Sequence, residues 1–436
     1  PLAYRRNMAL FGRRKHVEEE SQNVEELPVP TLPPPPEPDL NGLRRVQDHV
    51  EYLLELVEPL KPFGMSVLEA WNQVICEDID SMINVPPNST SKVAGYAVRA
   101  TDLWQNDQVV ESLQLATGTE HLGIGQAVPV DVGEVVPHGT TAVLPYSYAT
   151  VAGDRIEIIQ EVAEGEYLRA AGEHLAVGDR LLSEGEALTD RSVGMLAAAG
   201  IDKVLVRPRP RVVVVSSGAD LVEPGESVGY GESTDANSFL ISAAARAAGA
   251  TVFRVAVHSN DKQELKQAIT DQLIRADLVI STTGGRREEY EAVAEAMSEL
   301  GLVDAVEVAM SPGRTQTFGL IGEERVPMVM LPGNPVSAYV SFQVFVWPLL
   351  RRLMGAEVRR KSVRAIARTT MRSIWGQRHL LRAEVIDDGR LRTATRISDP
   401  FAMAELGRAN ALIVLDEDTE LVRPGEAVQC WLLDKS

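Results

Sequence analysis

The stretches V-V-V-V-S-S-G (212–218), D-L-V-I-S-T-T-G-G (277–285) and V-P-M-V-M-L-P-G-N-P (326–335) decide the fold of this chain of 436 residues. Each contains a continuous apolar run, which is typical of a strand buried on both faces. A further run of this kind covers 251–257, and helical patterns cover 237–248, 262–275, 288–300 and 335 to about 354. Strands that alternate with helices indicate a parallel sheet, so residues 211–354 are predicted to form a doubly wound α/β domain.

The ends of these strands predict a binding site. Ligands of open parallel sheets bind beyond the carboxyl ends of the strands. Three of the strands end in S-S-G, T-T-G-G and L-P-G-N-P. Glycine lets a ligand approach the backbone, and the N-terminus of a following helix favours an anion. One such peptide usually makes only a turn, but three in one sheet indicate a site for a phosphate-bearing ligand.

The rest of the chain has a different pattern on each side of this domain. Residues 1–40, with P-P-P-P at 33–36, are predicted to form a disordered tail, with a partner-recruiting arm as the alternative. Helices are predicted at 46–57 and 64–82. Short strand patterns then occur at 95–98, 127–132, 141–145 and 155–159, and a last group occurs at 362–367, 380–385, 411–415 and 428–433. The first group predicts a small inserted β domain and the second a barrel-like domain.

Composition limits the functional classes. The net charge is −19, which argues against broad binding to nucleic acids or anionic membranes. Two cysteines, Cys76 and Cys430, give neither a disulfide framework nor a zinc-site spacing. No apolar run approaches the roughly 18–20 residues that span a bilayer, and the first residues lack a secretion signal. We therefore expect a cytoplasmic protein without membrane insertion.

Several motifs together carry a family resemblance. The strings are S-S-G-A-D-L-V-E-P-G-E (216–226), T-D-A-N-S (234–238), M-S-P-G-R (310–314) and L-P-G-N-P-V-S-A (331–338), with S-K-V-A-G-Y-A-V-R-A (91–100) upstream. In this order they resemble the MoeA family, which includes the E domain of gephyrin. Within that family the chain is most similar to the divergent gephyrin-like proteins of bacterial cell division. The resemblance covers essentially all residues from Asn41 to Ser436.

The resemblance implies a multi-domain α/β architecture in an elongated homodimer, with an active cleft built from both chains. It implies a helical stem (41–93 and 170–207), an inserted β domain (94–169), a molybdopterin-binding-like α/β domain (208–356) and a C-terminal β-barrel (357–436), after the arm of residues 1–40. Enzymes of the family insert molybdate into adenylylated molybdopterin with magnesium. That chemistry requires carboxylates for the cation, and lysines or backbone amides for the phosphates and the oxyanion.

The chain departs from the family at many of these positions. Ala94, His174 and Ala219 stand where the family has carboxylates, and Ser311 and Arg314 stand where it has lysines. The loop at 284–291 is shortened and carries two arginines, Val132-Gly133-Glu134 lacks a family hydroxyl, and D-P-F-A-M-A-E (399–405) replaces a serine-bearing loop. A coordinated loss of this kind predicts a degenerate metal site.

The candidate site residues are of three kinds. The vestigial catalytic and metal-binding candidates are Glu173, Asp235 and Glu289. The cofactor-binding candidates are mainly positions that the fold itself would retain: Gly218, Asn237, Gly284, Gly285, Pro312, Gly313, Arg314, Pro332, Gly333, Asn334 and Pro335. The partner-binding candidates are Val50 and Leu53 of the stem helix and Leu415 and Val422 of the barrel, for which ordinary core positions are the alternative.

Two functions compete, and the sequence leaves open whether the chain is an enzyme. The favoured one is a homodimeric scaffold that needs no cofactor and binds a partner peptide, the C-terminal tail of FtsZ, at the division site, with a membrane receptor as a further partner. The alternative is an active molybdopterin molybdenumtransferase that uses magnesium, molybdopterin and molybdate, in which Arg286, Arg287 and Arg314 bind phosphates. A dinucleotide-dependent oxidoreductase is disfavoured, because no G-x-G-x-x-G follows the first strand of the central domain.

Overall fold

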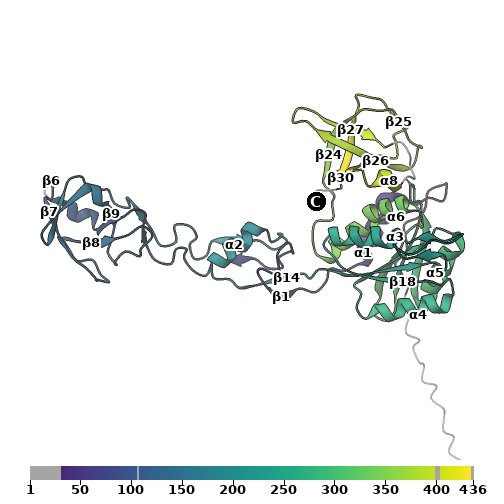
Figure 1. Ribbon diagram of the computed structural model, residues 1–436, viewed down its shortest axis with the longest axis horizontal. Helices are drawn as coiled ribbons and strands as arrows, with labels where there is room; N and C mark the ends of the chain where they lie inside the picture. Colours follow the sequence, from purple (N-terminus) through teal and green to yellow (C-terminus); the bar gives the residue numbers. More distant parts are fainter. Residues whose placement is uncertain (1–30, 106–107, 398–402, 434–436) are drawn as a thin grey trace, which may run out of the picture. The chain divides into compact units, whose positions relative to one another are not determined.

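The computed structural model describes residues 31–105, 108–397 and 403–433 (Figure 1). Its central region is a six-stranded sheet in the order β18-β15-β19-β23-β22-β20. The bounds are β15 Arg211–Ser217, β18 Thr251–Val257, β19 Leu278–Thr283, β20 Gly301–Glu307, β22 Thr315–Ile321 and β23 Val326–Met330. The first four strands of the order are parallel, as predicted, whereas β22 pairs antiparallel with both β23 and β20, and neither β22 nor β20 was predicted.

Helices cover both faces of this sheet. They are α3 Asn237–Ala247, α4 Lys262–Leu273, α5 Arg287–Leu300, α6 Pro335–Ser341, the π-helix η3 Phe342–Val346 and α7 Trp347–Leu353. On one face, Val213 and Val215 of β15 pack in a core with Leu265 of α4 and Val293 of α5. Side chains of a strand alternate between faces, and Val212 and Val214 are also fully buried. Burial on both faces confirms the doubly wound α/β prediction.

The first helix also agrees with its prediction. α1 spans Val46–Leu56 and ends before Pro59. Its buried His49 contacts the ring of Phe345 in η3, edge to face, with 5.1 Å between centroids. Just before α1, the buried Arg44 forms an ion pair with Asp304 of β20. α1 therefore packs on the central region.

The predicted helix at 64–82 is wrong. The structure has β1 Phe63–Ser66 paired with β14 Lys203–Val206, and β2 Ile79–Asp80 paired with β13 Arg180–Leu182. The backbone hydrogen bonds that a helix would have formed locally are instead made with residues about 100 or more positions later in the chain. Within the described residues of 41–93 and 170–207, the α-helices are α1 and α2 Asp190–Ala198.

The inserted β region forms a sheet in the order β10-β11-β7-β8-β4-β9. The predicted strands are confirmed as β4 Gly95–Val98, β8 Gln126–Val130, β9 Ala142–Pro145 and β11 Arg155–Ile158, whereas β7 Ser112–Leu115 and β10 Ala149–Ala152 were missed. Short elements complete this region and the stem: β3 Thr90–Ser91, η1 Ala100–Leu103, β5 Trp104–Gln105, β6 Gln108–Val109, η2 Tyr146–Tyr148 and β12 Leu168–Arg169.

The C-terminal region is a barrel. Its strands are β24 Ser362–Ala367, β26 Arg378–Asp387, β27 Arg392–Arg396, β28 Ala411–Leu415 and β30 Ala427–Leu432. They follow the order β26-β27-β24-β30-β28, and an additional pairing of β26 with β28 closes the ring. A short strand of the central region, β21 Met310–Ser311, pairs with β26. The barrel edge is therefore continuous with the loop that follows β21.

The remaining elements are β16 Leu221–Val222, β17 Ser233–Thr234, β25 Met371–Arg372, β29 Leu421–Val422 and α8 Met403–Leu406. Most of the predicted arm of residues 1–40, and residues 399–402 of the predicted replacement loop, lie outside the described part of the chain. Among the described residues, no helix combines the length and apolarity needed to cross a membrane.

Candidate functional site

The loops after β15, β19 and β23 converge at the carboxyl edge of the parallel strands. Gly285 follows β19 and Gly333 follows β23, and a Cβ atom on Gly333 would overlap the backbone of Gly285. Asn237, the first residue of α3, ties the two loops together. Its Nδ2 donates hydrogen bonds to the carbonyl oxygens of Thr283 (3.1 Å) and Gly333 (2.7 Å). The predicted convergence of the strand-end loops is therefore present, and a single side chain holds two of them together.

Asn334 and Pro335 have a local role. The Oδ1 atom of Asn334 accepts hydrogen bonds from the amides of Val336 (3.1 Å) and Ser337 (3.2 Å), and Pro335 is the first residue of α6. This is a helix N-cap followed by proline, an arrangement that satisfies free amides. Because these amides already have a partner, the start of α6 offers fewer free donors to a ligand than the sequence suggested.

A pair of carboxyl groups lies beside these loops. Glu289, on the first turn of α5, is only 1% exposed and lies against Asp220, which follows β15. Burial raises the pKa of Glu289, and the neighbouring Asp220 carboxyl raises it further. Asp220 was not among the predicted site residues, because the family pattern places its aspartate at Ala219, one residue earlier.

Five polar atoms at this edge are buried and have no hydrogen-bond partner among the described residues: Ser217 Oγ, Asp220 Oδ1, Asn237 Oδ1, Thr283 Oγ1 and Glu289 Oε1. Buried polar atoms are nearly always paired in folded proteins. Several unpaired ones at the ends of parallel strands, where ligands of such sheets bind, mark the edge as a ligand site.

Within a single chain, the three predicted metal ligands are not grouped into one site. Glu173 is ion-paired with Lys92 at 2.8 Å. Asp235 caps α3, because its Oδ1 accepts the amide of Ser238 at 3.0 Å and its Oδ2 accepts the Ser238 hydroxyl. Across the described residues, no group of three or more His, Cys, Asp or Glu side chains is arranged to hold a metal ion.

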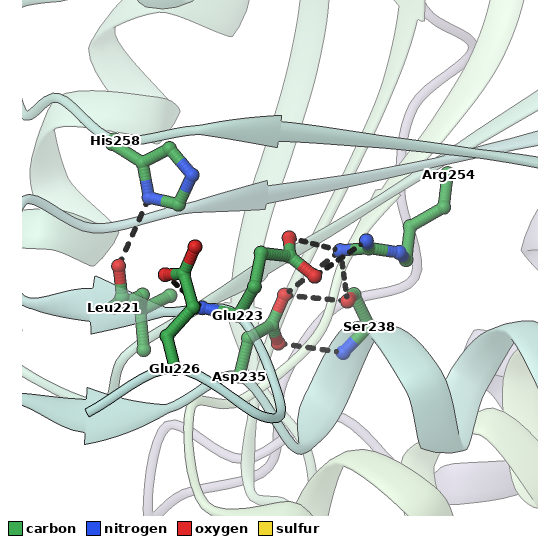
Figure 2. A network of polar contacts seen from close by, with 7 residues as sticks. All are labelled: Leu221, Glu223, Glu226, Asp235, Ser238, Arg254 and His258. Carbon is green, nitrogen blue, oxygen red and sulfur yellow. Dashed lines mark hydrogen bonds and ion pairs between the residues drawn. The ribbon is translucent and has the colours of Figure 1, made fainter. Parts of the chain in front are cut away.

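Figure 2 shows the network around Asp235. Arg254 of β18 forms a two-point ion pair with Glu223 (2.8 and 2.7 Å) and lies 3.6 Å from Asp235. Its guanidinium also lies over the ring of Phe239, 4.4 Å from the centroid. Nearby, His258 Nδ1 lies 2.9 Å from the carbonyl oxygen of Leu221. These contacts hold the segment 221–238 against the edge strand, so Asp235 has a structural role here.

The three arginines that were predicted to bind phosphates all have acidic partners. Arg286 pairs with Asp220 at 2.8 Å, Arg287 with Glu291 at 2.6 Å and Arg314 with Glu307 at 2.5 Å. Each of the three arginine side chains is more than half exposed. Exposed ion pairs contribute little free energy, so a phosphate can compete for these cations, but it must displace a carboxylate to do so.

A small pocket lies where the loop after β21 meets the barrel. It has a volume of about 50 Å³ and is lined by Ser311, Pro312, Val336, His379, Leu380, Leu381, Arg382, Arg396 and Ile397. Arg382 is only 4% exposed. Burial lowers the pKa of His379, and the charge of Arg396 lowers it further, so the imidazole is neutral at pH 7. Arg396 and Ser311 bring a guanidinium and a hydroxyl to this otherwise largely apolar pocket, and such a pair can bind a small oxyanion.

The sequence analysis did not predict this pocket. Pro312 was predicted, and the neighbouring Gly313 and Arg314 lie on the same loop. Arg382 and Arg396, however, occupy strand positions in a pattern typical of a barrel, and only the pairing of β21 with β26 brings them to Ser311.

The predicted peptide-binding residues need correction. Leu53, Leu415 and Val422 are 2%, 3% and 6% exposed, and the latter two belong to the barrel core. Side chains buried in this way are not available to a peptide, and only Val50 is half-buried. Leu53, Leu415 and Val422 are therefore core residues, which was the alternative to peptide binding.

Comparison with known proteins agrees with this architecture. Family models match at residues 44–200 ("MoeA N-terminal region (domain I and II)"), 213–352 ("Probable molybdopterin binding domain") and 352–433 ("MoeA C-terminal region (domain IV)"). Molybdopterin molybdenumtransferase 1 of Mycobacterium tuberculosis is 32% identical over 422 residues, which cover 90% of this chain and 99% of the relative. The molybdopterin molybdenumtransferase of Haemophilus influenzae is 29% identical over 391 residues, which cover 88% and 96%. The crystal structure of a molybdopterin biosynthesis MoeA protein from Pyrococcus horikoshii superposes with a TM-score of 0.80 at 25% identity, over 90% of this chain and 100% of that one.

Proposed function

Because the chain belongs to the MoeA family, we propose that it acts as a molybdopterin molybdenumtransferase with a rearranged site. The relatives that bear this name match the chain along nearly its whole length. The observation that carries the proposal is the pocket lined by Arg396 and Ser311, which offers a place for the oxyanion substrate.

Different residues would bind the two substrates. The unpartnered atoms of Ser217, Asn237 and Thr283 at the strand ends offer hydrogen bonds to a phosphorylated pterin. Arg396 and Ser311 would hold molybdate, and donors that are fixed before the reaction stabilise developing negative charge well. Gly285 and Gly333 keep the loops in contact, so that the strand-end atoms hold their positions.

Magnesium, which the family implies, does not fit the described residues of a single chain as they are arranged. The predicted ligands Glu173 and Asp235 are engaged elsewhere, and the remaining pair, Asp220 and Glu289, has Arg286 beside it. We therefore assign no step to a metal ion.

The test is release of AMP from adenylylated molybdopterin in the presence of molybdate. We expect the wild-type chain to release AMP, and Arg396→Ala to slow the release by roughly 10²-fold, the scale for loss of one oxyanion donor. Arg390→Ala is the matched control, since this exposed arginine lies outside the pocket. No AMP release by the wild-type chain would count against the proposal.

A second candidate function is the partner-binding scaffold. The observation that favours it is the pairing of Arg286, Arg287 and Arg314 with carboxylates, which leaves the phosphate-binding cations neutralised. A scaffold would show saturable binding of a partner peptide by calorimetry, with the FtsZ C-terminal tail as the first peptide to assay, and no AMP release. Absence of binding at micromolar peptide would remove the division-site version. In either function we expect a homodimer, which sedimentation would show.

A further inference from the structure

Arg286 occupies the place of a cation at the strand-end edge. Its guanidinium lies 2.8 Å from Asp220 Oδ2, and its Nη2 also donates to the carbonyl oxygen of Gly231 at 3.4 Å. Its backbone amide donates to Glu289 Oε2 at 3.3 Å. One residue thus contacts both members of the carboxyl pair, one through its side chain and the other through its main chain.

The carboxyl pair has the chemistry of a divalent-cation site. Magnesium in enzymes is commonly bound by one or two carboxylates together with waters and phosphate oxygens. Asp220 Oδ1 and Glu289 Oε1 are buried and accept no hydrogen bond from an N–H or hydroxyl group of another described residue, and the two carboxyl groups form a hydrogen bond with each other when Glu289 is protonated. The Glu289 carboxyl group lies close to the glycine backbone, because a Cβ atom on Gly284 would lie 2.9 Å from Glu289 Oε2.

We propose that the Arg286 guanidinium replaces a divalent cation at the Asp220–Glu289 pair and keeps this site free of metal. A tethered cation neutralises Asp220 without the loss of freedom that binding a free ion entails. It also repels an incoming divalent ion, since the like charges would lie within a few ångströms of each other. The inference rests on the geometry of this pair, and it concerns metal binding whether or not the proposed transferase activity is correct.

Removal of the guanidinium should open the site to metal. The probe is Mn²⁺ alone, followed by electron paramagnetic resonance on the full chain, with no pterin present. We expect no saturable binding by the wild-type chain at millimolar Mn²⁺. Arg286→Gln should gain one site, with affinity at least about tenfold higher than that of the wild type, because a neighbouring positive charge is gone.

Arg287→Gln is the matched control. It removes the same charge one position later, from a side chain that is paired with Glu291. We expect it to behave as the wild type. The double variant Asp220→Asn with Arg286→Gln should lose the gained site, which would locate the ion at the carboxyl pair. The Arg286 side chain is 58% exposed, and thermal unfolding would verify that its variant remains folded.

Two results would overturn the inference. Saturable Mn²⁺ binding by the wild-type chain, equal to that of Arg286→Gln, would show that the guanidinium moves aside for a metal. Failure of folded Arg286→Gln to gain a site would show that the carboxyl pair is no metal site at all. Neither result depends on AMP release, so failure of the proposed function and failure of this inference can be told apart.

Discussion

Glu289 is a carboxyl group with 1% exposure beside a second carboxyl group, and this should be visible in the pH dependence of stability. Its pKa is raised, first by burial and then by Asp220. The folded state therefore holds this proton more tightly than the unfolded state does, and the stabilisation is lost as the pH rises through the folded-state pKa. Glu289→Gln should raise the free energy of unfolding at about pH 8 by on the order of 1 kcal/mol, and by less at about pH 4.5.

Chemical denaturation at the two pH values measures this difference. Glu288→Gln is the control, because Glu288 is the exposed neighbour on the same helix turn and should change little at either pH. Equal destabilisation by Glu289→Gln at both pH values would contradict the prediction, since it would show that the carboxylate is stabilising in its charged form.

Gly333 should not tolerate a side chain. Its Cβ would overlap the backbone of Gly285, so Gly333→Ala must push two loops apart, at a cost of roughly 3 kcal/mol.

Gly194, inside α2, is the matched control. A Cβ there would meet no neighbouring atom within 4 Å among the described residues, so Gly194→Ala should stabilise the folded chain by about 0.5–1 kcal/mol. Thermal unfolding of both variants compares them, and a neutral Gly333→Ala would show that the loops do not need their close contact.

At the scale of single residues, the sequence predicted backbone requirements better than charges. The glycines at 285 and 333 and the cap at Asn334 follow from local chain geometry, and they lie where they were expected. The partner of a charged side chain depends on tertiary distance. Arg286 was predicted to bind phosphate, but it pairs with Asp220, which is distant in the sequence and belongs to the loop after another strand.

Among the elements, α1 carries a buried titratable group that links it to the central region. His49 is 1% exposed, and its pKa is lowered to about 4, first by burial and then by the charge of Arg44. The folded state therefore resists protonation, so stability is fully present above the ordinary histidine pKa and is lost as the pH falls from about 6.5 to about 4. The loss should reach about 3 kcal/mol near pH 4.

Hydrogen–deuterium exchange across Val46–Leu56 at pH 7 and at about pH 5 would measure this loss of stability. Protection of α1 in the wild type should fall with pH beyond the intrinsic exchange effect, whereas His49→Gln should remove most of that pH dependence. His121→Gln, a change at an exposed histidine, is the control and should leave it intact. An unchanged pH dependence in His49→Gln would assign the effect to another group.

Elements with a distinctive local pattern could be predicted, and those that depend on a distant partner could not. The apolar runs of β15, β18 and β19 and of the barrel strands β24, β26, β28 and β30 needed no partner to be visible, whereas β27 was not predicted. The segment 64–82 has apolar residues at helical spacing, but its first residues form strand β1, which pairs with the distant strand β14. β20 and β22 were missed because a predicted parallel sheet gives no reason to expect antiparallel pairing at its edge.

At the scale of the whole molecule, function depends on contacts between regions that the sequence patterns treat separately. The oxyanion pocket takes Ser311 from the central region and Arg396 from the barrel. Ser311 belongs to a motif that the sequence shows, but Arg396 has no local signal, so a composite pocket of this kind could not be predicted from the sequence. Its persistence depends on how firmly the connection at 355–361 holds the two regions together.

Arg360 is the main contact in that connection. Its guanidinium lies 4.2 Å from the ring centroid of Trp347 in α7 and 5.5 Å from that of Trp431 in β30, and it donates a 2.5 Å hydrogen bond to Gln343 Oε1 in η3. Burial lowers its pKa to about 10, so it is still charged at pH 7. Arg360→Ala removes a cation–π pair on each side and leaves Gln343 without this donor, at a cost of about 2–3 kcal/mol.

We expect calorimetry of Arg360→Ala to separate unfolding of the barrel from that of the central region, because the variant loses a contact common to both. Binding of an oxyanion such as molybdate should weaken in parallel, since its pocket lies at the same junction. Arg359→Ala, at the exposed preceding position, should leave both properties unchanged. A single unfolding transition with unchanged oxyanion binding in Arg360→Ala would show that the pairing of β21 with β26 alone holds the regions together, and that the arginine only fills space between two tryptophans.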